Sequence, residues 1–138
     1  MGNVSGRYPS QKMTCSIQFE SHRDELAFIY RLEHDPDVLE FYDQPGRIKL
    51  TYQSKKERQV GVLHTPDFFV LRQASCGWVE CKMEDDLLRL AEQQPHRYVR
   101  NADGTWSCPP GEEYTAPLGL FYQVHSSREI DWPVLSCH

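Results

Sequence analysis

The sequence lacks the features that mark membrane proteins, secreted proteins and zinc-binding modules. Its uncharged apolar stretches run to only about six residues, far short of the roughly twenty that a membrane-spanning helix needs. No basic segment followed by an apolar one resembles a signal peptide at the start. The five cysteines include no C-x-x-C pair and have no zinc-finger spacing. We therefore expect a cytosolic protein with reduced thiols and no membrane segment.

The length and composition fit one folded domain. The chain has 138 residues, of which 39% are hydrophobic and 12% aromatic. A chain of this size buries about two thirds of its unfolded surface, which is enough for a hydrophobic core. Residues 1–18 are polar and aperiodic, and we expect them to form an extended arm. Residues 19–138 are expected to form the domain itself.

A net positive charge, the usual mark of a nucleic-acid-binding protein, is also absent. The 15 Lys and Arg residues face 20 Asp and Glu residues, which leaves a formal charge of −5. The charge is nevertheless sorted along the chain, because residues 20–43 carry eight acids and two basic residues. The following segment carries a basic run consisting of Arg47, Lys49, Lys55, Lys56 and Arg58. Such a run is either a solvated strand pair or a patch that contacts phosphates.

Hydrophobic periodicity predicts a mixed α/β fold. A first helix is expected from an N-cap at Ser21 to Pro36, with apolar residues at helical spacing. Strands are predicted over residues 38–42, 48–52, 60–63, 68–71, 77–82 and 120–124. Further helices are predicted over 87–92 and 109–118, and Asp103-Gly104 indicates a hairpin turn. This order of elements predicts a mixed central β-sheet flanked by helices.

The most informative motif is Pro66-Asp67 followed by Glu80-Cys81-Lys82. On a strand, residues i and i+2 point to the same face, so Glu80 and Lys82 project together. If the strand that follows Asp67 pairs with the strand carrying Glu80, the two carboxylates converge at one edge of the sheet. Converging carboxylates are typical ligands of a hard divalent cation. A lysine beside them can orient a water and stabilise charge on a phosphate.

A third carboxylate is expected from the first helix. Glu25 precedes Phe28, Ile29 and Leu32 by three, four and seven residues, so it heads the apolar stripe of that helix. An acid on a core-facing stripe is costly unless a cation or a donor meets it. Asp24 falls on the flank of the same stripe. We therefore favour Glu25 and keep Asp24 as the alternative.

These motifs resemble the PD-(D/E)XK nuclease superfamily, and more closely the N-terminal catalytic domain of TnsA-type transposon endonucleases. The resemblance extends over nearly the whole chain in order. It is carried by residues 6–13, 19–21, 25–38, 44–45, 65–68, 79–82, 109–114 and 126–130. Counting from Ser21 with the family's spacing selects Asp24, whereas counting back from Asp35 selects Glu25. The resemblance implies a restriction-endonuclease-like fold for residues 19–138.

The resemblance also implies an activity. Glu25, Asp67 and Glu80 would bind Mg²⁺ or Mn²⁺, and Lys82 would position the attacking water. Enzymes of this type cut the 5′ strands of double-stranded DNA at transposon ends in the bacterial cytoplasm. Their partners are a DDE-type transposase subunit, which cuts the 3′ ends, and an ATPase regulator. Two alternatives stay open: a restriction, repair or phage nuclease of the same superfamily, and an inactive DNA- or protein-binding module on this fold.

A histidine precedes the motif, and a Q-x-x-x-Y spacing follows it further along the chain. His64 precedes Asp67 by three residues and could approach the site, but we expect it to face solvent at a strand end. Gln94-x-x-x-Tyr98 resembles the Q-x-x-x-Y element of RecB-like nucleases. Pro95 interrupts the helical geometry that this element needs, so we assign it no role.

Overall fold

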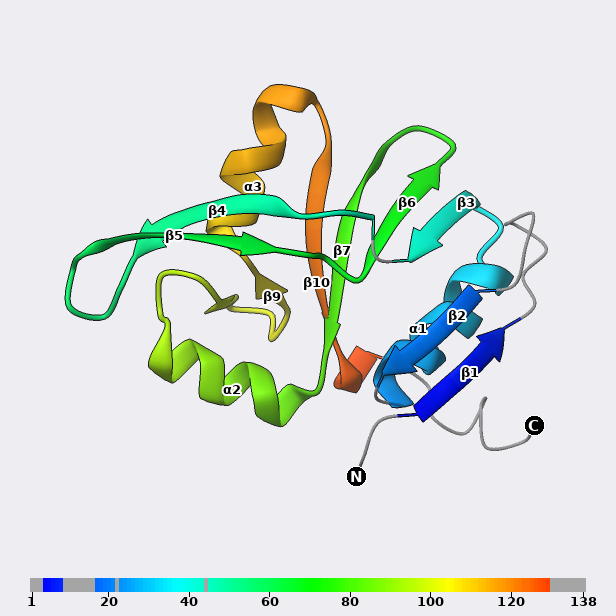
Figure 1. The fold of residues 1–138 in the computed structure, drawn as a ribbon, viewed down its shortest axis with the longest axis horizontal. Coiled ribbons are helices and arrows are strands. Elements are labelled where there is room, and N and C mark those ends of the chain that lie inside the picture. The colour runs from blue at the N-terminus through cyan, green and yellow to red at the C-terminus, as the bar shows by residue number, and fades with distance from the viewer. Residues whose placement is uncertain (1–3, 9–16, 22, 44, 130–138) are drawn as a thin grey trace.

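A six-stranded mixed sheet forms the centre of the protein (Figure 1). The computed structural model describes the backbone of residues 4–8, 17–21, 23–43 and 45–129, and the side chains from residue 28 onward within these ranges. The strand order is β3-β6-β7-β10-β9-β8, and β10 runs parallel to β7 while the other pairs are antiparallel. The strands are β3 (Val38–Asp43), β6 (Phe68–Arg72), β7 (Cys76–Lys82), β8 (Val99–Arg100), β9 (Trp106–Ser107) and β10 (Phe121–Ser126). This architecture confirms the expected mixed α/β fold and is consistent with a restriction-endonuclease-like fold.

One face of the sheet is covered by helix α1 (Arg23–His34). Its apolar stripe packs against the residues of β3, β6 and β7 that alternate to this face. The cluster contains Phe28, Ile29, Leu32, Val38, Phe41, Phe68, Val70, Val79 and Cys81. All nine side chains are buried. The helical spacing in the sequence therefore identified the stripe that the structure buries.

A second hydrophobic cluster lies around strands β10 and β9 of the sheet. It joins β10 and β9 to helix α2 (Glu84–Gln93), to strand β4 (Ile48–Gln53) and to Cys108, the N-cap residue of helix α3 (Pro109–Thr115). Its buried members are Ile48, Leu50, Leu87, Tyr98, Trp106, Cys108, Tyr122 and Val124. Trp78 of β7 packs against this cluster, so β7 contributes to both clusters through alternate residues. No helix in the described part of the chain is long and apolar enough to cross a membrane.

Strands β4 and β5 (Gln59–His64) form a separate antiparallel hairpin that projects from the body of the protein (Figure 1). Strands β3 and β4 are consecutive in the sequence but do not pair with each other, because β3 pairs with β6 and β4 with β5. Gly46 in this turn has a φ of +114°, a conformation that favours glycine. The inner residues Ile48 and Leu50 anchor the base of the hairpin in the second cluster.

Two short strands are described in the N-terminal segment. Strand β1 (Val4–Tyr8) pairs antiparallel with β2 (Ile17–Ser21), with Val4 opposite Ser21 and Tyr8 opposite Ile17. The sequence analysis predicted no strands in this segment. The division at residue 18 itself stays a prediction.

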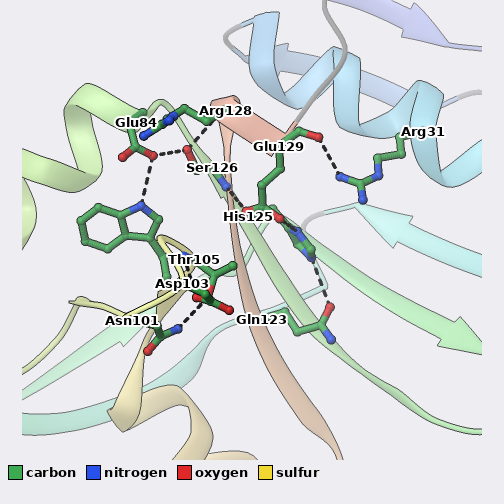
Figure 2. Close-up of polar contacts among 11 residues, drawn as sticks. Arg31, Glu84, Asn101, Asp103, Thr105, Gln123, His125, Ser126, Arg128 and Glu129 are labelled. Atoms are coloured by element: carbon green, nitrogen blue, oxygen red, sulfur yellow. Dashed lines mark hydrogen bonds and ion pairs between the residues drawn. The ribbon is translucent and has the colours of Figure 1, made fainter.

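Polar contacts tie the end of β10 to the helices on both sides (Figure 2). The Ser126 hydroxyl contacts the Glu84 carboxylate, which also accepts a hydrogen bond from Trp106 Nε1 at 3.1 Å. The Ser126 N–H donates to Glu129 Oε2 at 2.8 Å, and Arg31 Nη1 of α1 donates to the Glu129 carbonyl at 3.3 Å. These bonds hold α1, α2 and the end of β10 in one arrangement around the E-x-K strand.

Candidate active site

The hairpin of β6 and β7 brings the two carboxylates of the motif together. Phe68 pairs with Val79, so Asp67 and Glu80 occupy the next opposed positions at the end of the hairpin. Opposed residues in an antiparallel pair share a face of the sheet. Lys82 lies two residues further along β7, and its Nζ is 3.9 Å from Glu80 Oε1. The structure therefore places Asp67, Glu80 and Lys82 next to one another.

Glu80 is a buried carboxylate with dedicated hydrogen-bond donors. Its side chain is 1% exposed. The Tyr98 hydroxyl donates to Oε1 at 2.8 Å, and the Tyr122 hydroxyl donates to Oε2. Burial by itself raises the pKa of Glu80, but the nearby His64 and Lys82 and the Tyr122 hydroxyl outweigh burial and lower the pKa to about 2. Glu80 is therefore ionised at any physiological pH.

Asp67 has the opposite electrostatic character. Its Oδ2 accepts a hydrogen bond from the backbone N–H of Cys81 at 2.7 Å. Burial is the main cause that raises the pKa of Asp67 to about 6, and the charge of Glu80 adds to it. The Cys81 N–H, Lys82 and His64 lower the pKa and offset part of that rise. A carboxylate with a raised pKa gains from a cation beside it, because the cation stabilises its charged form.

His64 lies at this site, and the expectation that it faces solvent is wrong. Its side chain is 17% exposed, and its Nε2 is 3.2 Å from Glu80 Oε1. Its Nδ1 is 3.3 Å from Arg97 Nη2. Because a guanidinium can only donate, Nδ1 must accept, which places the hydrogen of a neutral ring on Nε2. That nitrogen points near Glu80 without an aligned hydrogen bond to any described residue.

Tyr98 and Arg97 reach the site from the segment after α2. The Arg97 guanidinium lies 5.6 Å from the centre of the Tyr52 ring and 5.4 Å from that of Tyr98, which are cation–π distances. Helix α2 ends at Gln93, so Tyr98 does not sit on a continuous helix with Gln94. The Q-x-x-x-Y spacing pointed to a residue of the site, although Tyr98 arrives through a turn. Tyr122 carried no sequence signal beyond its place in an apolar strand.

Glu25 and Asp24 lie in α1, but their side chains are outside the described residues. Helix α1 packs on the face of β7 that carries Val79 and Cys81, whereas Glu80 and Lys82 alternate to the opposite face. A metal ligand from the first turn of α1 would therefore have to reach past the end of the sheet to the face that carries Glu80. The role of Glu25, and the choice between Glu25 and Asp24, stay predictions.

The oxygen donors of the site suit a hard divalent cation in kind. Among the described side chains, no group of three or more His, Cys, Asp and Glu residues is close enough to hold a metal ion. Asp67 and Glu80 supply two of the three carboxylates that were expected, and no described residue donates to Asp67 Oδ1. Carboxylate oxygens are the ligands that Mg²⁺ and Mn²⁺ prefer, and Mg²⁺ commonly uses one or two of them with water and phosphate oxygens.

The basic residues predicted to contact DNA lie on or beside the β4–β5 hairpin, away from the carboxylates. Residue 47 precedes β4 and residue 49 lies in it, while residues 55, 56 and 58 lie in the turn between the strands. All five side chains, those of Arg47, Lys49, Lys55, Lys56 and Arg58, are exposed. His64 at the end of β5 connects this hairpin to Glu80.

Comparison with known proteins identifies the family. A search of curated proteins gives no match. The family described as TnsA-like endonuclease N terminal matches residues 35–132, which include β3 through β10 and all of the described site. Because this match extends over more than half of the chain, the protein belongs to the TnsA-like endonuclease N-terminal family.

Proposed function

We propose that this protein is a metal-dependent DNA endonuclease that hydrolyses the 5′ strands at transposon ends as part of a heteromeric transposase. The observation that carries the proposal is the opposed pair of Asp67 and Glu80 with Lys82 beside it, in a family of endonucleases. The spacing P-D…E-x-K and the β6–β7 hairpin together put acid, acid and lysine at one end of the sheet. This arrangement supports phosphodiester hydrolysis better than binding alone.

Asp67 and Glu80 would hold the divalent cation, with Glu25 as the third ligand. When bound, Mg²⁺ or Mn²⁺ would supply positive charge that acidifies a water molecule and stabilises the charge that develops on the phosphate. Glu80 is already ionised at neutral pH, and Asp67 is mostly ionised above its pKa of about 6. Lys82, 28% exposed, can donate a hydrogen bond to the attacking water and orient it.

The DNA would lie across the β4–β5 hairpin. The five exposed basic residues on or beside this hairpin form a local positive region on a chain whose formal net charge is −5. Phosphate contacts of this kind position DNA without reading its sequence. Selection of the transposon end would therefore come from partners, a DDE-type transposase subunit that cuts the 3′ ends and an ATPase regulator.

The test is cleavage of transposon-end DNA in the presence of the partner transposase, with and without Mg²⁺ or Mn²⁺. We expect metal-dependent cutting of the 5′ strands by the wild type and none by Asp67→Ala. Asp85→Ala is the matched control, because Asp85 is an exposed aspartate on α2. Equal cutting by wild type and Asp67→Ala would show that the catalytic centre lies elsewhere. Cutting that persists in a chelator would remove the metal from the proposal.

A further inference from the structure

Two buried tyrosines from separate elements hold the Glu80 carboxylate. Tyr98 follows α2, and Tyr122 lies on β10, the parallel neighbour of β7. Their side chains are 2% and 4% exposed, and each hydroxyl donates to a different oxygen of Glu80. A buried ionised carboxylate without donors would be strongly destabilising, and the two hydroxyls satisfy one acceptor position on each oxygen of Glu80.

The donors leave Glu80 with little freedom. A carboxylate offers about four acceptor positions, two on each oxygen. On Oε1, one position receives the Tyr98 hydroxyl, and His64 Nε2 at 3.2 Å stands beside the other. On Oε2, the Tyr122 hydroxyl takes one position. At least one acceptor position, on Oε2, receives no described donor, and a cation can use it.

The surroundings hold both tyrosines in place. The Arg97 guanidinium packs against the Tyr98 ring, with 5.4 Å from Cζ to the ring centre. Gly111 of α3 faces Tyr122, and a Cβ at this glycine would lie 2.5 Å from Cδ1 of the ring. Helix α3 thus approaches the ring so closely that only glycine fits there. The close packing of α3 against the ring therefore helps to set the position of the Tyr122 hydroxyl.

We propose that Tyr98 and Tyr122 are positioning residues that orient Glu80 so that an acceptor position left free by the described donors is presented to a divalent cation. The inference rests on the proposed function, in which Glu80 is a metal ligand. Hydrogen-bond partners of metal-binding carboxylates tune affinity, and their loss typically weakens metal binding 10- to 100-fold. The two hydroxyls act through Glu80 and need no contact with the metal or the DNA.

The test measures Mn²⁺ affinity of the full chain by electron paramagnetic resonance of the free ion, at a temperature where every variant is folded. Tyr98→Phe and Tyr122→Phe are each expected to bind Mn²⁺ about ten-fold or more weakly than wild type. Tyr42→Phe is the matched control, because the Tyr42 hydroxyl donates to Glu40 at 2.8 Å in an exposed tyrosine–glutamate pair on β3. Its affinity should equal that of the wild type.

A second measurement avoids the risk that a Phe variant fails to fold. In wild-type protein labelled with 3-fluorotyrosine, the ¹⁹F resonances of Tyr98 and Tyr122 should shift as Mg²⁺ is added, and that of Tyr42 should stay. Unchanged or tighter Mn²⁺ binding by both Phe variants, or Tyr98 and Tyr122 resonances that do not respond to bound Mg²⁺, would overturn the inference and leave the proposed function standing. A wild type that binds neither ion would overturn both.

Discussion

Replacing Asp67 with asparagine should stabilise the protein at neutral pH while it abolishes cleavage. Burial is the main cause that raises the pKa of Asp67 from 3.8 to about 6, so the folded state holds its ionised form at a cost. Asparagine has nearly the same shape, carries no charge and can still accept the N–H of Cys81. It removes the cost of the buried charge and keeps the hydrogen bond.

The size of the gain follows from the pKa difference. One pKa unit corresponds to about 1.4 kcal/mol, so a rise of about two units corresponds to roughly 3 kcal/mol as an upper bound. Because Asp67 is not fully buried and asparagine is itself polar, we expect a gain of about 1–3 kcal/mol at pH 7.5. In the folded state Asp67 keeps its proton to a higher pH than in the unfolded state. The contribution of protonated Asp67 to the free energy of unfolding of the wild type is therefore lost as pH rises from about 4 to about 6. The gain of the variant should therefore shrink as pH falls.

The assay is urea denaturation of wild type, Asp67→Asn and the surface control Asp85→Asn at pH 7.5 and pH 4.5. The expected pattern is a higher free energy of unfolding for Asp67→Asn at pH 7.5 and a smaller difference at pH 4.5. Asp85→Asn should instead lose about 0.3–1 kcal/mol at pH 7.5, because its carboxylate lies in the first turn of α2. A lower stability of Asp67→Asn at pH 7.5 would refute the reasoning. So would a difference that does not vary with pH, because a pH-independent effect cannot come from the titration of Asp67.

Two further predictions concern DNA binding and the sheet. Changing the three basic residues of the 55–58 turn to alanine should weaken DNA binding and reduce the slope of log K against log salt by about 0.9 per lost phosphate contact, measured by fluorescence anisotropy; Arg100→Ala on β8 is the control, and an unchanged slope would count against a DNA-facing hairpin. Gly77→Ala should lower the free energy of unfolding by about 1–3 kcal/mol or more, because its Cβ would lie 2.2 Å from the backbone carbonyl oxygen of Phe121. Gly61→Ala should have a smaller effect, since its nearest neighbour is the flexible end of a lysine side chain, and equal losses in denaturation experiments would contradict this account.

The order of elements from α1 onward and the pair of opposed carboxylates were predictable from local pattern. Apolar residues at helical spacing in α1 are buried as a stripe, and the strand after Asp67 pairs with the strand of Glu80 as expected. Both predictions rest on periodicity and on short connections, which depend on residues close in sequence. The same local reasoning could not place His64, because its position depends on how the β4–β5 hairpin docks.

What the sequence alone determined was a mixed α/β domain with Asp67, Glu80 and Lys82 at one end of a hairpin, because strand alternation and a short hairpin leave few other arrangements. Only the tertiary structure decided that Glu80 is held by tyrosines from two distant segments, 18 and 42 residues away. It also decided that Asp67 and Glu80 have pKa values shifted in opposite directions. The physical reason is that burial and hydrogen-bond donors depend on which segments pack around a group, and those segments come together only in the folded chain.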